Sequence, residues 1–115
     1  MRYKRYTLAD LEKSASRKRF NVVSFFEGGG GYSCGYKLAG GDVLCVNEFQ
    51  QVHGDAYSAN FPDTPVIIDD IRNVEPADIR QIIGNVDIDI LDGSPPCPPF
   101  SMAGSKREGW GKEKM

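Results

Sequence analysis

The sequence "NVVSFFEGGGGYSCGYKLAGGDVLCVNEF", residues 21–49, holds two apolar runs separated by four consecutive glycines and a helix-like segment. The first run, residues 21–26, is apolar and β-branched, which is typical of a buried parallel strand. The glycines that follow mark a tight turn whose backbone another molecule can approach closely. Residues 32–41 predict a helix ended by two glycines, and residues 42–49 predict a second strand. The stretch therefore predicts a strand–helix–strand unit with parallel strands.

The same alternation continues through the rest of the chain. Thr7 can cap a short predicted helix over residues 8–15, and Pro76 suits the first turn of a later helix. The further predicted elements are a helix over residues 50–61, a strand over 64–69, a helix over 74–85 and a strand over 86–92. Short crossovers between apolar strands predict an α/β fold, in which helices cover both faces of a parallel sheet.

Composition limits the class of protein. The 115 residues are enough for one domain with a single core. The three cysteines, Cys34, Cys45 and Cys97, match no zinc-binding spacing, and their odd number argues against a disulfide framework. No apolar run resembles a secretory signal or approaches the length of a membrane span. We therefore expect a soluble cytoplasmic protein that uses neither a membrane nor a metal ion.

The net charge of −2 hides a strong segregation of charge. Residues 1–20 hold seven Lys or Arg and two acids, and residues 105–115 hold four bases and two acids. Residues 21–104 hold three bases and twelve acids. The acidic centre is a poor surface for nucleic acid, whereas the basic flanks could contact phosphates. Charged runs at chain ends are, however, usually just solvated tails.

The residues that could bind a ligand or take part in catalysis all lie at the ends of predicted strands or directly after them. Residues 27–31 follow the first strand, Glu48 ends the second, Asp70 follows the third and Cys97 follows the fourth. In open parallel sheets, ligands bind beyond the carboxyl ends of the strands. This shared position favours a functional role for these residues over a purely structural one.

The glycine run and Glu48 together predict a nucleotide or nucleoside cofactor. Glycines before a helix leave backbone N–H groups free, and a carboxylate at the end of the next strand can accept hydrogen bonds from a ribose diol. The dinucleotide fingerprint GxGxxG is broken, because its third glycine falls on Ser33 or Cys34. The alternative is that the glycines only form a turn.

Cys97 lies in the proline-rich stretch "LDGSPPCPPFS", residues 91–101. Prolines restrict their own φ angle and the residue before them, so this loop is stiff. A thiol held in a rigid loop after a strand is a candidate nucleophile. The alternative is a small apolar residue in a turn, since most free cysteines are buried and inert.

Three segments in order resemble the DNA cytosine-5 methyltransferases. The segment "FFEGGGGYSCGYKLAGGDVLCVNEF" resembles the first two motifs of that family, which open with phenylalanine, any residue, glycine, any residue and two glycines. The segment "DDIRNV" resembles the aspartate–isoleucine motif, and "DGSPPCPPFS" resembles the proline–cysteine catalytic loop. The resemblance runs from about residue 22 to residue 101. It implies a Rossmann-like, S-adenosylmethionine-dependent methyltransferase fold that is incomplete at its C-terminal end.

The resemblance also implies residue roles. Glu48 would hold the ribose hydroxyls of S-adenosylmethionine, and Asp70 the adenine amino group. Cys97 would add to carbon 6 of a cytosine flipped out of double-stranded DNA, because a base in a duplex is out of reach. The other cofactor-pocket residues implied are Phe26, Gly28, Gly30, Gly31, Ile71 and Pro95.

Two features depart from the family pattern. Pro98 stands where the family usually has glutamine, and the later motifs, with their ring-protonating glutamate and recognition domain, have no equivalent here. We therefore expect the N-terminal part of a longer enzyme of a bacterial or phage modification system. The expected divisions are a basic lead-in over residues 1–20, a cofactor-binding and catalytic-loop portion over 21–104, and a mobile-loop tail over 105–115.

Three alternatives remain open from the sequence. A tRNA cytosine-5 methyltransferase would share the same fold and loop. A catalytically silent binding module would keep the pocket without the chemistry. A nicotinamide-dependent oxidoreductase would use the same kind of sheet, although the broken glycine fingerprint disfavours it.

Overall fold

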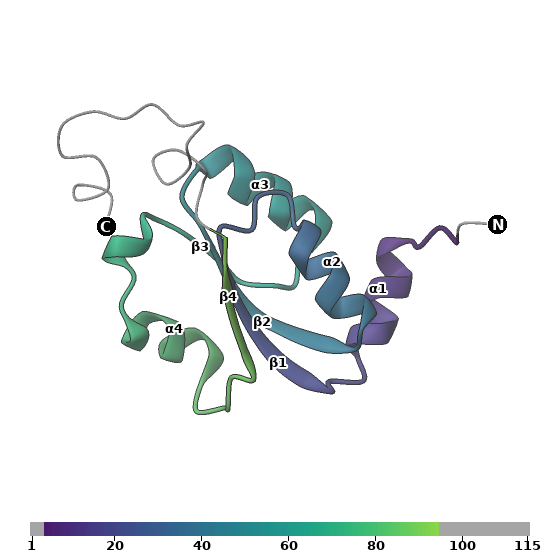
Figure 1. The fold of residues 1–115 in the computed structure, drawn as a ribbon. Coiled ribbons are helices and arrows are strands. Elements are labelled where there is room, and N and C mark those ends of the chain that lie inside the picture. The colour runs from purple at the N-terminus through teal and green to yellow at the C-terminus, as the bar shows by residue number, and fades with distance from the viewer. Residues whose placement is uncertain (1–3, 95–115) are drawn as a thin grey trace.

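The computed structural model describes residues 4–94. They form a parallel sheet with helices around it (Figure 1). The helices are α1 (Leu8–Ala15), α2 (Gly31–Leu38), α3 (Gln51–Asn60) and α4 (Pro76–Ile83), with a short 3-10 helix η1 (Ile71–Asn73). The strands are β1 (Phe20–Phe25), β2 (Gly41–Glu48), β3 (Val66–Ile68) and β4 (Ile90–Gly93). The predicted order of helices and strands is confirmed.

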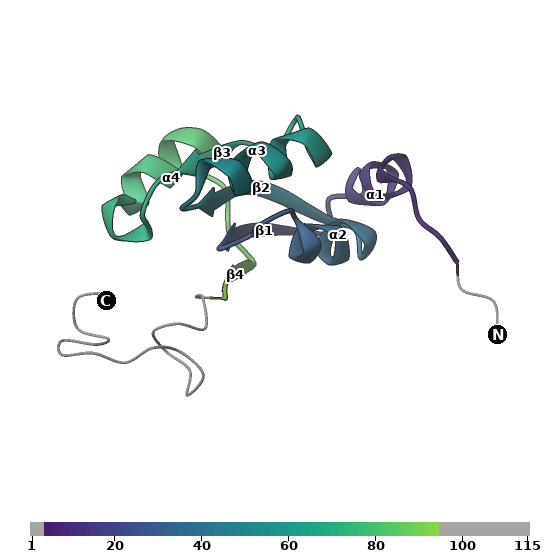
Figure 2. The ribbon, with the colours of Figure 1, turned by 90° about the horizontal axis from the view of Figure 1, so that it is seen from above.

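The four strands lie in the order β3-β2-β1-β4, and every neighbouring pair is parallel. The chain moves outward from β1 to β3 and then returns past both strands to β4. Because such crossovers are right-handed, α2 and α3 cover one face of the sheet and α4 covers the other. Figures 1 and 2 both show α4 on the opposite side of the molecule from α1. The predicted Rossmann-like α/β fold is confirmed.

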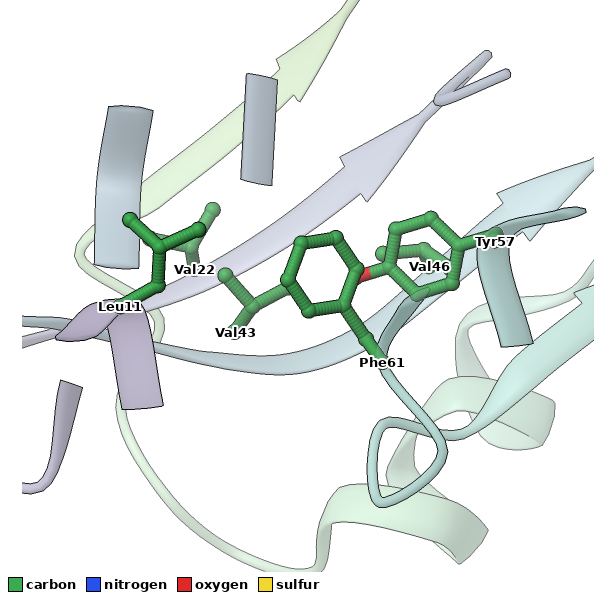
Figure 3. Close-up of a cluster of buried hydrophobic side chains, with 6 residues drawn as sticks. All are labelled: Leu11, Val22, Val43, Val46, Tyr57 and Phe61. Carbon is green, nitrogen blue, oxygen red and sulfur yellow. The ribbon is translucent and has the colours of Figure 1, made fainter. Parts of the chain in front are cut away.

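The main hydrophobic cluster lies on the face that carries α1, α2 and α3 (Figure 3). Its buried members are Leu11, Val22, Val43, Val46, Tyr57 and Phe61. The rings of Tyr57 on α3 and of Phe61, which follows α3 directly, have centroids 5.1 Å apart and are tilted by 49°. This tilted arrangement suits the ring quadrupoles and adds to the free energy gained by burial. The cluster fixes α3 beneath the glycine loop that follows β1.

Lys37 of α2 is a buried charged residue that connects three helices. Its Nζ lies 2.7 Å from Glu12 Oε1 of α1 and 4.7 Å from the centre of the Phe61 ring on α3. The ion pair and the cation–π contact compensate for the loss of water around the ammonium. Lys37 therefore helps α1 pack against the sheet.

Most elements differ from their predicted bounds by one to three residues, and the larger differences concern the start of the fourth strand and the segment after β3. The fourth strand begins at Ile90, not at residue 86, because the residues before it bond to the side chain and backbone of Asn21. The backbone N–H of Asn21 donates to Asp89 Oδ2 at 2.7 Å. The side-chain amide of Asn21 donates to the Asp87 carbonyl at 2.9 Å. The turn η1 was not predicted, and Asp70 caps it by accepting from the Arg72 N–H at 2.9 Å.

Among the described residues, no helix is long and apolar enough to span a membrane.

Candidate functional site

The glycine loop between β1 and α2 lies at the carboxyl edge of the sheet. Phe26 has a φ of 58°, which is uncommon for a residue with a side chain. Its N–H donates to the Asn47 carbonyl of β2 at 3.0 Å, so the chain is held against β2 as it leaves β1. Strained backbone of this kind concentrates at functional sites. The predicted pocket residue Phe26 therefore lies at a turn that the neighbouring strand holds in place.

The glycines of this loop have two different surroundings. A Cβ atom at Gly30, where φ is 102°, would lie 2.5 Å from Phe61 Cε2. A Cβ atom at Gly28, Gly29 or Gly31 would meet no atom within 4 Å. Gly30 is therefore required for packing against α3, whereas the others leave open space. Open space of this kind allows a ligand to approach closely. The place of Gly28, Gly30 and Gly31 in a cofactor pocket stays a prediction.

Glu48 ends β2 and faces the glycine loop. Its side chain is nearly buried, and Oε2 accepts a hydrogen bond of 2.8 Å from the Gly28 N–H. Oε1 accepts from the Phe49 N–H at 3.1 Å and lies 3.5 Å from His53 Nδ1. A carboxylate has about four acceptor positions, so these contacts leave room for a ligand hydroxyl. Glu48 thus shapes the loop as well as being placed to meet a ligand.

Glu27 is a functional candidate whose role the sequence did not predict. It is 4% exposed, and Oε1 accepts hydrogen bonds from the Ser33 N–H at 2.8 Å and from the Ser33 hydroxyl. Burial raises the pKa of Glu27 above its usual range, although the bonds from Ser33 oppose that shift. The sequence signal was an acidic residue before a glycine run, but burial cannot be read from one residue type.

Asp70 and Ile71 follow β3 at the same edge of the sheet. Asp70 Oδ2 lies 2.5 Å from Arg72 Nη2, and Oδ1 accepts from Arg72 Nε at 3.0 Å. Ile71 is half-buried at the start of η1. Glu48 pairs with Ile68 in the sheet, so Asp70 lies two residues beyond the level of Glu48. The fold thus brings both predicted acids to one edge, with the Asp70 carboxylate already paired to Arg72.

Phe49 is a second candidate that the sequence did not single out. It follows Glu48 at the end of β2 and is 59% exposed, which is unusual for a phenylalanine. An exposed ring at the carboxyl edge could stack on a flat apolar ligand group. The signal that could have found it was an aromatic residue directly after the predicted ribose-binding carboxylate.

The residue that precedes the cysteine segment is hydrogen-bonded to α2. Ser94 Oγ donates to the Tyr32 hydroxyl of α2 at 2.9 Å, and Ser94 follows β4 directly. Pro95 and Cys97, predicted for the cofactor pocket and for catalysis, lie outside the described residues. The described part of the chain therefore places the approach to that segment beside the first turn of α2.

The glycine loop, Glu48 and Phe49 together offer features that an organic ligand can use. Among residues 4–94, no group of three or more His, Cys, Asp or Glu side chains could hold a metal. The edge offers open space over glycines, a carboxylate from β2 and an exposed aromatic ring, and the switch point between β1 and β4 lies beside them. These features suit a nucleoside, which needs hydroxyl acceptors and a surface for stacking.

Three relatives are similar to this chain over its greater part. The Type II methyltransferase M.DdeI of Desulfomicrobium norvegicum is 36% identical over 86 residues, covering 75% of this chain and 20% of the relative. M1.HphI of Haemophilus parahaemolyticus is 37% identical over 82 residues, covering 71% and 22%. M.AquIA of Picosynechococcus is 33% identical over 87 residues, covering 74% and 35%. The chain therefore spans between 20% and 35% of the length of these relatives.

No solved structure matches this chain. The comparison with family models agrees with the relatives in pointing to the DNA methyltransferases. A family model described as C-5 cytosine-specific DNA methylase matches residues 20–114, which includes the glycine loop, Glu48 and the cysteine segment. The family predicted from the sequence motifs is therefore confirmed: this chain belongs to the C-5 cytosine-specific DNA methylases.

Proposed function

We propose that this protein takes part in the methylation of carbon 5 of cytosine in DNA, with S-adenosylmethionine as the methyl donor. The observation that carries the proposal is the glycine loop, which the Gly28–Glu48 hydrogen bond ties to β2 while Gly28 and Gly31 leave open space. This arrangement provides room for a nucleoside and a carboxylate for its hydroxyls. Family membership supports DNA as the substrate.

The predicted pocket residues divide between the two ends of the nucleoside. Glu48 would accept hydrogen bonds from the ribose hydroxyls, and Phe26, Gly28, Gly30 and Gly31 would shape the backbone around them. Asp70 and Ile71 would hold the adenine, with Phe49 as a further stacking surface and Pro95 as a further pocket residue. When bound, S-adenosylmethionine supplies a methyl group that is activated by its positively charged sulfur.

Cys97 would act as the nucleophile toward the target base. Its thiolate would form a bond to carbon 6 of the flipped cytosine, which makes carbon 5 electron-rich enough to accept the methyl group. Loss of the proton from carbon 5 then expels the thiolate and restores the aromatic ring. A free thiol with a pKa of about 8.5 is mostly protonated at pH 7, so the assembled site must favour the thiolate.

The relatives support a modification enzyme of bacterial type. M.DdeI and M1.HphI are both named Type II methyltransferases. A DNA methyltransferase of this class would act in the cytoplasm as part of a longer chain, with residues 21–104 as its cofactor-binding portion. The family model favours DNA over tRNA as the substrate.

Calorimetric titration of the complete gene product, with S-adenosylmethionine and separately with NAD, tests the cofactor. We expect binding of S-adenosylmethionine alone. Binding of NAD alone would support the nicotinamide-dependent alternative, and binding of neither would remove the cofactor assignment. Methyl transfer to cytosine DNA, compared with tRNA, then tests the substrate, and binding without transfer would support the silent binding module.

We expect Glu48→Ala to weaken S-adenosylmethionine binding. A hydrogen bond to a charged group contributes about 1.5–3 kcal/mol, which corresponds to a roughly 10- to 150-fold rise in Kd. Glu48→Gln should give an intermediate loss, because the amide keeps one acceptor oxygen. Calorimetry measures both values, with Asp63→Ala as the control, since Asp63 is an exposed acid before β3. An unchanged Kd in Glu48→Ala would exclude Glu48 from the site.

A further inference from the structure

Glu27 supplies the side-chain cap that α2 otherwise lacks. The N-cap residue is Gly30, which has no side chain to bond to the first turn of the helix. The Glu27 carboxyl acts as the cap instead, because it accepts a hydrogen bond from the N–H of Ser33, the third residue of α2. An acceptor at this position satisfies one of the free N–H groups of the helix start. Glu27 therefore joins the beginning of the glycine loop to the helix at its end.

The contact continues from Ser33 to α3. The Ser33 hydroxyl bonds to Glu27 Oε1 and lies 2.8 Å from the hydroxyl of Tyr57, and all three side chains are buried. The Tyr57 ring packs on Phe61, the residue that contacts Gly30. One end of the loop is thus linked by hydrogen bonds to Tyr57, and its middle packs against Phe61 and Tyr57.

The second carboxyl oxygen has no such support. Glu27 Oε2 and Ser24 Oγ are both buried, and neither has a hydrogen-bond partner of good geometry among the described residues. Ser24 still lies near enough to lower the pKa of Glu27, but burial raises that pKa by more. The titratable side chains that influence or face Glu27 are Cys34 and Tyr36 of α2, Tyr57 of α3 and Asp92 of β4. None of these carries a positive charge, and no ion pair to Glu27 is present in residues 4–94. Burying a carboxylate in such surroundings costs far more free energy than burying a neutral carboxylic acid.

We propose that Glu27 is a positioning residue for the cofactor loop, and that it acts as a neutral carboxylic acid linking the loop to α2 and α3 through Ser33 and Tyr57. Oε1 accepts both bonds from Ser33, and the proton resides on Oε2. Glu27 does not touch the cofactor in this role. It holds the backbone of residues 28–31 where the cofactor would bind, so this inference rests on the proposed function.

Burial raises the pKa of Glu27, so the stability of the fold should depend on pH through this residue. A folded-state pKa above the unfolded value favours folding most at low pH. The contribution of Glu27 is complete below its ordinary pKa of 4.5 and is lost as pH rises through the raised value. Glu27→Gln keeps an acceptor for Ser33 and cannot ionise. We therefore expect this variant to gain stability relative to the wild type as pH rises.

Two measurements on the complete gene product separate this inference from the proposed function. Urea unfolding without cofactor, at pH 4.5 and at pH 8, tests only whether Glu27 is a neutral carboxylic acid in the folded protein. The urea midpoint of Glu27→Gln should rise relative to that of the wild type between pH 4.5 and pH 8. A constant difference, or one that changes in the opposite direction, would overturn the neutral carboxylic acid.

Titration with S-adenosylmethionine at pH 7 tests the positioning role. Glu27→Gln should keep the wild-type Kd within about twofold, Glu27→Ala should raise it about tenfold, and Tyr57→Phe about threefold. Circular dichroism must show that each variant is folded, and Tyr57→Phe is the milder change if Glu27→Ala unfolds. Wild-type affinity in Glu27→Ala, or an equal loss in Glu27→Gln, would overturn the proposal. Failure of the wild type to bind would overturn the cofactor assignment while leaving the urea result valid.

Discussion

Cys97→Ser in the complete gene product should lower the rate of methyl transfer by roughly three orders of magnitude or more. A serine hydroxyl is almost never ionised at neutral pH, whereas a thiol is close enough to its pKa to be activated by its site. The change replaces the side-chain sulfur atom with oxygen and alters little else. The Kd for S-adenosylmethionine should therefore stay within about twofold of the wild-type value.

The control for this prediction is Cys45→Ser. Cys45 lies buried in β2, and burial raises its pKa to about 11, so its thiol is inert at neutral pH. Cys45→Ser should reduce stability and leave the chemical step unchanged in the folded protein. DNA that carries 5-fluorocytosine provides a second readout, because the wild type should form a covalent adduct and Cys97→Ser should form none. Retained turnover in Cys97→Ser would end the nucleophile assignment.

The parts of the fold that the sequence predicted have strong local signals. The apolar run before the glycines became β1 within one residue at each end, and the run ending at Glu48 became β2. Glycine and proline mark the ends of these elements, because their backbone preferences act locally. The carboxyl-edge position of Glu48 and Asp70 followed from the strand order alone, since parallel strands end on the same side.

The parts that were not predicted depend on contacts between distant segments. The roles of Glu27 and Gly30 depend on α3, which lies more than 20 residues further along the chain. A single sequence shows that Glu27 is acidic but not that a tyrosine and a serine enclose it. The start of β4 depends on Asn21, which is 68 residues away from Asp89. Such features require the three-dimensional arrangement.

Charge and position together constrain where DNA could be bound. The exposed residues Arg17, Lys18 and Arg19 precede β1, at the amino end of the sheet. The glycine loop follows β1 at the opposite end, about 20 Å away for a strand of six residues. These basic residues therefore lie at a strand's length from the proposed cofactor site. A contact between them and DNA would involve the flanking duplex, not the flipped base.

Gly30→Ala should destabilise the fold by about 2–4 kcal/mol. The new methyl group would lie 2.5 Å from the Phe61 ring, in a core where Phe61 and Tyr57 are fully packed, and φ at this position is 102°. Both effects act on the folded state, so the loss should appear in urea unfolding without any cofactor. Because the loop would shift to relieve the contact, the affinity for S-adenosylmethionine should fall as well.

Two neighbouring glycines separate the packing effect from the ligand effect. Gly31→Ala places a methyl group in open space at the first position of α2, where alanine suits a helix. It should keep or slightly raise stability and weaken cofactor binding about tenfold, because the resemblance assigns Gly31 to the pocket. Gly29→Ala, also in open space, is the control for both measurements. If Gly31→Ala bound the cofactor as well as Gly29→Ala does, the open side of the loop would not face the cofactor. Gly30 would then serve only to pack against Phe61.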